Sequence, residues 1–460
     1  MERKKIISAS IYILGGFFLS QLMRLGGNLV VTRLLTPEMF GVMAIINVLM
    51  HGLAMFSDLG LRAFIIRSPK ALSAKELNTV WTIQVIRGWL MFLGACLIAL
   101  TFYMVNEIFV LDKSSVYRSS ELPYLVVTVG LISIVKGYAT LAPAIMDREL
   151  RPARLEGVEL ISQFISLSMM LFLAWKFSSI WALVSAAVTG ALVKVFLIYR
   201  YFSIRHQLAW DKIVVKKVFN FGKWIFISTV LTYLAMQGDK LIFSVHISAT
   251  EIGVYSIAFM LSGVIANVLE KLVTKVWLPV LSKIARERPA ELKRKYYIVR
   301  LRQDMVIFLA IGILIAISPR MIEFLYDERF YSAGWMMQVL LIGVVGQVIS
   351  RLGIACLTAL GKTKIRMRIM LVRSLGVFVG LPVLFYYYGF YGAVWGVALN
   401  HFIALPVQYM AMHRQGILSL FLELRAVPLV FIVYWLTEFF MSNTFFNFWE
   451  LVKCQLLALL

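Results

Sequence analysis

Basic residues fall inside long apolar segments of the chain, where a charge is costly, and four of them are candidates for a binding site. They are Arg24, Lys136, Lys271 and Arg351. At membrane depth a cation is tolerated when it meets water or a partner of opposite charge. Guanidinium and ammonium groups form charge-assisted hydrogen bonds with phosphate and carboxylate oxygens. The pattern therefore indicates a water-filled site for an anionic ligand.

Polar residues at helical spacing accompany these cations. In the first segment Gln21, Arg24 and Asn28 are three and then four positions apart, so they share one helix face. Comparable faces in later segments carry Asn47, His51 and Asp58; Lys136 and Thr140; Glu156, Glu159, Gln163 and Ser166; Asn267, Lys271 and Thr274; and Gln347, Arg351 and Thr358. The residues that we expect to contact a substrate are Arg24, Asn28, His51, Lys136, Asn267, Lys271 and Arg351.

Structural roles compete for several of these side chains. Arg24 could extend to the membrane interface, or pair with Asp58. His51 taken alone is more typical of a hydrogen-bonded histidine in the protein interior. Both alternatives stay open on the sequence alone.

The acidic residues also have structural alternatives. Glu156 and Glu159 suit the start of a helix, where they could pair with Arg151 or Arg154. Glu270 suits neutralisation of a cation on the seventh or the tenth segment.

The source of energy for any transport is not encoded in a recognisable motif. The chain has no GxxxxGKS or GxxxxGKT loop, so we do not expect it to hydrolyse ATP. An ion gradient is the natural alternative, and the acids that could carry the ion or proton are Asp58, Glu159, Asp239 and Glu270. We expect no cofactor and no bound metal.

The composition is that of a membrane protein. The 460 residues are 61% hydrophobic and 15% charged, with a mean hydropathy of +0.84. Soluble domains are about half apolar and about a quarter charged. The net charge of +22 falls mostly in short loops, so it indicates topology and contact with anionic headgroups. Nucleic-acid binding is therefore not expected.

Hydropathy predicts an all-α polytopic protein with 12–14 transmembrane helices. The predicted spans are 6–34, 39–57, 78–105, 121–146, 153–176, 179–202, 218–245, 252–278, 299–318, 333–360, 366–388, 391–412, 421–441 and 445–460. The last is short and contains Glu450 and Lys453, so it could lie on the membrane surface. The longest connection is expected to be the basic stretch 283–298.

Lys and Arg gather in alternate loops, which predicts the orientation. These loops are 62–75, 148–154, 200–217, 283–302 and 362–368. Basic loops face the cytoplasm, and the amino terminus lies on their side.

A weak internal repeat suggests two lobes. Residues 36–45 align with 248–257, and Gly41 matches Gly253 in this alignment. Because both copies begin on helices that leave the cytoplasm, the lobes would be parallel repeats about an axis along the membrane normal. We expect an amino-terminal lobe at 1–205, a basic linker at 206–217, a carboxyl-terminal lobe at 218–414 and extra helices at 415–460.

Six short motifs resemble those of a known family. They are LLTPEMFGV (34–42), SDLGL (57–61), DRELRPARLE (147–156), FGKW (221–224), GDKLIFSVHISATEIGVYSIAF (238–259) and LPVLSKI (278–284). Their order and spacing, from about residue 5 to 415, resemble Wzx-type polysaccharide transporters of the multidrug/oligosaccharidyl-lipid/polysaccharide exporter superfamily.

The resemblance implies two six-helix lobes around a central cavity, alternating access, and outward movement of a prenyl-diphosphate-linked glycan across a bacterial inner membrane. It implies membrane lipids, polysaccharide polymerases and glycosyltransferases as partners, and we expect a monomer. In relatives such as the lipid II flippase, cations lie on the first and eighth helices, which matches Arg24 and Lys271 by position.

Other functions are less well matched. A drug antiporter of the same superfamily would be expected to place a carboxylate in the first helix. A membrane glycosyltransferase or polymerase would need paired catalytic carboxylates on an outer loop, and none stands out among Glu107, Asp112 and Glu121. A scaffold would not need polar faces in both halves.

Overall fold

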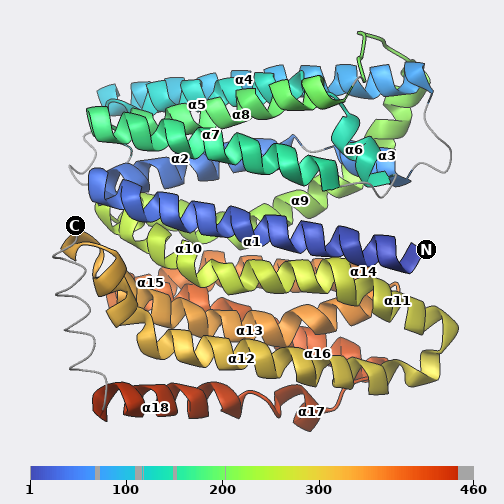
Figure 1. Ribbon diagram of the computed structural model, residues 1–460, viewed down its shortest axis with the longest axis vertical. Coiled ribbons are helices and arrows are strands. Elements are labelled where there is room, and N and C mark those ends of the chain that lie inside the picture. The colour runs from blue at the N-terminus through green and yellow to red at the C-terminus, as the bar shows by residue number, and fades with distance from the viewer. Residues whose placement is uncertain are drawn as a thin grey trace. The chain divides into compact units, whose positions relative to one another are not determined.

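The computed structural model describes residues 2–57, 59–67, 73–108, 117, 119–148, 153–202 and 204–443 (Figure 1). Within these ranges the chain folds almost entirely into helices, as predicted. Nine helical segments among the described residues are long and apolar enough to cross a membrane. They are Pro37–Phe56, Ala74–Met104, Leu155–Phe177, Trp181–Tyr201, Ala249–Leu272, Pro289–Leu325, Glu328–Ala359, Lys364–Arg414 and Leu420–Ser442. The protein is thus an all-α polytopic membrane protein.

The chain forms two compact units. Met1–Tyr233 with Phe243–Gly253 forms the amino-terminal unit, and Leu234–Ile242 with Val254–Leu460 forms the carboxyl-terminal unit. The elements of the first are α1 (Glu2–Leu34), α2 (Pro37–Phe56), α3 (Leu61–Arg67), α4 (Ala74–Ile108), α5 (Leu122–Gly137), α6 (Ala142–Arg148), α7 (Ala153–Phe177), α8 (Trp181–Tyr201) and most of α9 (Lys212–His246). In this unit α4 packs on α5, α5 on α8, and α7 on both α8 and α1 (Figure 1).

The predicted span 121–146 is interrupted in the structure. Helix α5 ends at Gly137, and the short α6 starts only at Ala142. The side-chain amide of Gln84 on α4 donates to the carbonyl oxygens of Gly137 at 3.0 Å and Ala139 at 2.8 Å. Carbonyl groups at a helix end need such donors, so Gln84 satisfies the end of α5 where the sequence showed only a continuous apolar run.

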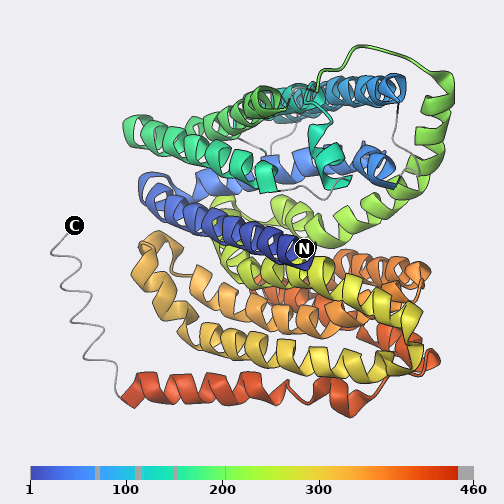
Figure 2. The same ribbon diagram turned by 45° about the vertical axis from the view of Figure 1, so that its right-hand side comes forward.

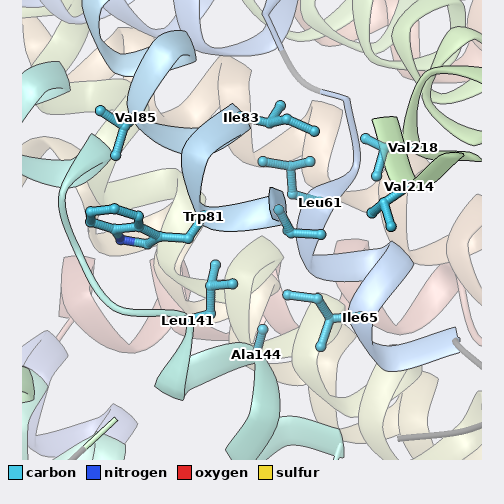
Figure 3. Packing of buried hydrophobic residues seen from close by; sticks show 10 residues of the cluster. Leu61, Ile65, Trp81, Ile83, Val85, Leu141, Ala144, Val214 and Val218 are labelled. Carbon is cyan, nitrogen blue, oxygen red and sulfur yellow. The ribbon is translucent and has the colours of Figure 1, made fainter. Parts of the chain in front are cut away.

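A compact apolar core joins the short helices to the long ones near this break. Leu61 and Ile65 of α3 and Trp81 of α4 meet Leu141 and Val214 there (Figure 3). Burial of side chains of this size stabilises a fold by about 1.5–3 kcal/mol each. The core therefore anchors α3, α6 and the start of α9 against α4.

The carboxyl-terminal unit contains one helix, α12, that is clearly longer than its predicted span of 299–318. It comprises α10 (Ala249–Leu272), of which all but the first turn belongs here, η2 (Val273–Trp277), α11 (Leu278–Glu287), η3 (Pro289–Glu291), α12 (Leu292–Leu325), η4 (Glu328–Phe330), α13 (Ala333–Ala359), α14 (Thr363–Leu375), η5 (Gly376–Gly380), α15 (Leu381–Ile403), α16 (Leu405–Arg414), α17 (Leu420–Leu424) and α18 (Pro428–Asn443). Yellow α12 lies between orange α13 and red α18 (Figure 2).

The predicted basic loop 283–298 was wrong. Helix α11 continues to Glu287 and α12 begins at Leu292, so only one 3₁₀ turn separates them. Before α11 the chain forms a π-helical turn, in which the N–H of Leu278 reaches back to the carbonyl of Val273. Pro279 lacks an N–H, and the wider turn lets the helix continue past it.

The predicted break between spans 366–388 and 391–412 is confirmed at Gly389. Its φ of +60° and ψ of −152° leave the helical region, and this backbone conformation suits glycine. Beyond it the chain folds back, because Gly392 lies against Leu384 and Gly396 against Leu381. Residues on either side of Gly389 therefore form a helical hairpin.

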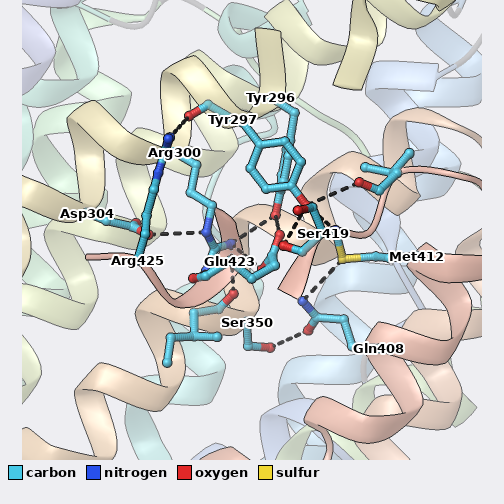
Figure 4. A network of polar contacts seen from close by, with 12 residues as sticks. Tyr296, Tyr297, Arg300, Asp304, Ser350, Gln408, Met412, Ser419, Glu423 and Arg425 are labelled. Atoms are coloured by element: carbon cyan, nitrogen blue, oxygen red, sulfur yellow. Dashed lines mark hydrogen bonds and ion pairs between the residues drawn. The ribbon is translucent and has the colours of Figure 1, made fainter. Parts of the chain in front are cut away.

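A buried charge network attaches α17 to α12 (Figure 4). Arg300, which the charge pattern placed in a cytoplasmic loop, has a side chain only 1% exposed. It pairs with Glu423 at 2.9 Å and with Asp304 at 3.2 Å, and it donates to the hydroxyl of Tyr296 at 2.9 Å. Tyr296 in turn donates to Glu423 at 2.9 Å. The positive charge is thus buried as part of the fold.

Candidate anion-binding cavity

The amino-terminal unit contains an open cavity of about 590 Å³ between six helices. Its walls come from α1, α2, α4, α5, α7 and α8. The polar and charged residues that line it are Arg24, Asn47, Gln84, Arg87, Ser133, Lys136, Glu159, Ser162, Gln163, Ser166 and Lys194. Four of these are basic and one is acidic, so the cavity has an excess of positive charge.

Two of the predicted cations, Arg24 and Lys136, meet in this cavity. Neither side chain has an ion pair or hydrogen bond with any residue that the structure describes. Both are substantially exposed in the structure. Their hydrogen-bond donors therefore have no competing acceptor among the described residues.

The third cation of the cavity, Lys194 on α8, is paired. Its ammonium group forms an ion pair with the carboxylate of Glu159 on α7. The two side chains remain 43% and 41% exposed, so the pair faces the cavity rather than the protein interior. Glu159 does not simply cap α7, because its partner comes from a neighbouring helix.

The fourth cation, Arg87 on α4, supports the end of α2. Its Nε donates to the hydroxyl of Ser57 at 3.0 Å, and its Nη2 donates to the carbonyl of Ala54 at 2.8 Å. These contacts satisfy groups at the carboxyl end of a helix. Arg87 therefore has a positioning role as well as a charge in the cavity.

Neutral polar residues tie the walls together. The amide of Gln163 accepts from the hydroxyl of Ser20 and donates to its carbonyl oxygen at 2.8 Å, which joins α7 to α1. Ser166 donates to the carbonyl of Ala186 on α8 at 2.7 Å. The polar face predicted on α7 thus contributes both lining and interhelical contacts.

A second cavity of about 300 Å³ adjoins the first beside the break after α5. Gln84, Lys136 and Lys194 line both cavities. The second adds Arg62 on α3, while its other walls are largely apolar, from residues such as Leu141 and Ile198. Lys136 and Lys194 therefore lie where a polar space meets an apolar one.

In the carboxyl-terminal unit, Glu270 pairs with Arg351, so the prediction that Glu270 neutralises a cation on the tenth segment is confirmed. Arg351 also donates to the Gln347 side-chain oxygen at 3.1 Å. The Gln347 amide lies 3.1 Å from His401, which lies 2.7 Å from Arg373. The result is a polar chain across α10, α13, α14 and α15.

The remaining predicted residues are distributed more widely. Asn267 is exposed and Lys271 half-buried on α10, and Asn28 is half-buried on α1. His51 is exposed on α2, with its ring 6.1 Å from that of Tyr233. None of these four lines the cavity of the amino-terminal unit.

Two predicted coupling acids remain. Asp239 is buried and accepts a hydrogen bond from Tyr255 at 2.6 Å. Asp58 lies outside the described residues.

Sequence reasoning missed Lys194, Arg87 and Arg373. Lys194 lies well inside the predicted span 179–202, so the criterion that selected Lys136 would also have selected it. Arg87 and Arg373 lie inside predicted spans in the same way. All three have partners on other helices, which the sequence alone does not reveal.

Comparison with known proteins gives consistent matches over most of the chain. The family described as polysaccharide biosynthesis protein matches residues 30–334. A Klebsiella pneumoniae protein, described as an uncharacterized membrane protein in the cps region, is 23% identical over 89% of this chain and 80% of its own. The lipopolysaccharide biosynthesis protein WzxC of Escherichia coli is 22% identical over 85% of this chain and 79% of its own.

Among solved structures, the lipid II flippase MurJ in its inward closed conformation matches with a TM-score of 0.68. This match has 16% sequence identity and covers 98% of this chain and 96% of that one. At this identity the likeness shows a shared fold.

Proposed function

Because the chain belongs to the polysaccharide biosynthesis protein family, we propose that it moves a prenyl-diphosphate-linked glycan from the cytoplasmic to the outer leaflet by alternating access. The protein is a Wzx-type polysaccharide flippase of the multidrug/oligosaccharidyl-lipid/polysaccharide exporter superfamily, and its activity is transport rather than catalysis. The diphosphate linkage and the direction of movement are our proposal.

The main support for this proposal is the basic cavity of the amino-terminal unit. A diphosphate brings several anionic oxygens, and Arg24 and Lys136 offer donors without partners among the described residues. Charge-assisted hydrogen bonds from such groups are about twice as strong as neutral ones. A cationic drug would be repelled by the same charges, which disfavours a drug antiporter.

The other parts of the proposal concern energy, partners and location. An ion gradient drives transport, and the coupling ion or proton binds one of Asp58, Glu159, Asp239 and Glu270. Glycosyltransferases supply the substrate, and a polymerase consumes it. The monomer lies in a bacterial inner membrane with a cytoplasmic amino terminus. The sequence repeat divides it into lobes 1–205 and 218–414, joined by 206–217 and followed by 415–460, whereas the compact units of the structure first divide after Tyr233, within α9.

The test is complementation of a strain that lacks this protein, with surface glycan as the readout. Arg24→Ala should abolish glycan export at unchanged protein abundance, because loss of a cation makes membrane insertion easier. Arg24→Lys should restore part of the export, since the charge remains but the bidentate guanidinium is lost. Arg24→Glu should export no better than Arg24→Ala.

The matched control is Arg33→Ala, since Arg33 is an exposed residue on the same helix that does not line the cavity. It should export glycan normally. Normal export by Arg24→Ala would contradict the proposal, as would loss of export explained by missing protein.

A further inference from the structure

Of the described residues that line the amino-terminal cavity, Glu159 alone is acidic. An acid lowers the affinity of a site for anions, so its presence in an anion-binding cavity needs a reason. Its carboxylate is bound to the ammonium group of Lys194, and both side chains stay more than two-fifths exposed. This pair is therefore accessible to a ligand that enters the cavity.

The neighbouring cations differ from Lys194 in one respect. Arg24 and Lys136 have no ionic partner among the described residues, whereas Lys194 has one. Lys136 is close enough to interact electrostatically with both Glu159 and Lys194. Glu159 thus neutralises one charge of a cavity lining in which no other described residue is acidic.

We infer that Glu159 is a resident counterion. Its carboxylate binds the ammonium group of Lys194 when the cavity is empty, and a phosphate oxygen of the substrate takes its place. This inference rests on the proposed function. Carboxylate and phosphate oxygens accept hydrogen bonds from the same ammonium donors, so they compete for Lys194. In the empty cavity Glu159 lowers the free-energy cost of holding several cations close together at membrane depth.

The competition also has a consequence for release. A transport site must bind its cargo strongly enough to load it and weakly enough to let it go. When the diphosphate leaves, Glu159 regains Lys194, and this ion pair offsets part of the lost interaction. Lys194 and Lys136 line both cavities, so this phosphate subsite lies where the polar cavity adjoins the apolar one.

The competition between Glu159 and phosphate for Lys194 also limits how transport can be coupled to a proton gradient. Besides Glu159, the charged residues that line the cavity, among those described, are Lys194 on α8, Lys136 on α5, Arg24 on α1 and Arg87 on α4, all of them cations. A proton taken up by Glu159 would remove the competing anion and strengthen substrate binding. By linkage, substrate would equally favour the proton.

Proton and substrate would then travel together. An inward proton gradient opposes export of a cargo that carries protons outward with it. Glu159 is therefore a counterion, and this narrows the proposed coupling acids of an exporter driven by such a gradient to Asp58, Asp239 and Glu270.

The experiment measures binding of inorganic pyrophosphate to the purified full-length protein in lipid nanodiscs by calorimetry. Glu159→Gln should bind pyrophosphate about fivefold more tightly than wild type, the factor expected from loss of one exposed competing ion pair. Glu159→Asp, which keeps the charge, should bind much as wild type does. A second change, Lys194→Gln, should abolish the gain in the Glu159→Gln background.

The matched control is Glu156→Gln, because Glu156 lies one turn earlier on α7 and does not line the cavity. Its affinity should equal that of wild type. Equal or weaker binding by Glu159→Gln, in protein that elutes as wild type does on size exclusion, would overturn the inference and leave the proposed function intact. If neither wild type nor any variant binds pyrophosphate or a short prenyl diphosphate, the proposed anion site itself fails, and the inference with it.

Discussion

Gly41 on α2 faces the backbone at the start of α10, and Gly253 on α10 faces the backbone at the start of α2. A Cβ on Gly41 would lie 1.8 Å from the carbonyl oxygen of Ala249, and one on Gly253 would lie 1.8 Å from that of Pro37. In the internal repeat Gly253 aligns with Gly41, and Ala249 aligns with Pro37. Reciprocal contacts of this kind are typical of segments related by a local two-fold axis.

Replacement of Gly41 by Ala should destabilise the protein by about 3 kcal/mol or more, because two backbones would have to separate. Thermal unfolding of the purified protein measures the effect. The control is Gly26→Ala on α1, where an added Cβ meets nothing within 4 Å. There alanine should be neutral or stabilise the helix by up to about 1 kcal/mol. A Gly41 variant as stable as the Gly26 variant would contradict the close approach of Gly41 to the backbone of Ala249.

Loss of Arg300 should leave two buried carboxylates uncompensated. Arg300→Met is expected to cost about 3–5 kcal/mol of folding free energy. The matched control is Arg302→Met, because Arg302 is exposed on the same helix and should change stability by no more than about 0.5 kcal/mol. The double variant Arg300→Met, Glu423→Gln should be more stable than Arg300→Met alone, since one unpaired charge is removed. No such recovery would mean that Arg300 acts through packing rather than charge.

His206 should make stability depend on pH. Its ring stacks on Trp81, and its Nε2 accepts a hydrogen bond from the Leu141 N–H at 3.1 Å. Burial lowers the pKa of His206 below its usual value. The unfolded chain therefore binds the proton more readily, so the contribution of His206 is complete above about pH 6.5 and is lost as pH falls toward the lower folded pKa.

The matching experiment compares the melting temperatures of wild type and His206→Gln between pH 7.5 and 5. The wild type should lose stability relative to the variant as the pH falls, because glutamine does not titrate. Parallel curves for the two proteins would show that the neutral ring is not required by the fold.

The predicted orientation places Lys176 outside and Arg288 in the cytoplasm. Single cysteines at these positions, in a background without native cysteines, can be probed in intact cells with a membrane-impermeant thiol reagent. Lys176→Cys should react, and Arg288→Cys should react only after the cells are opened. Reaction of both in intact cells would overturn the number of crossings between them.

The sequence was sufficient to predict an all-α membrane protein, because a membrane-crossing helix needs about 20 consecutive apolar residues and leaves a clear hydropathy signal. It also located the break at Gly389 and the cations Arg24 and Lys136, since a charge inside such a span is conspicuous. Each of these inferences needs only the order of residues within a short stretch of the sequence.

Which charges are paired depends on contacts between distant parts of the chain. Lys194 and Glu159 lie 35 positions apart, and Arg300 and Glu423 lie 123 apart, so no local pattern relates them. The end of α5 at Gly137 likewise depends on an amide from α4. A charge is stabilised by whatever lies within a few ångströms of it, and in a helical bundle those neighbours come from other helices.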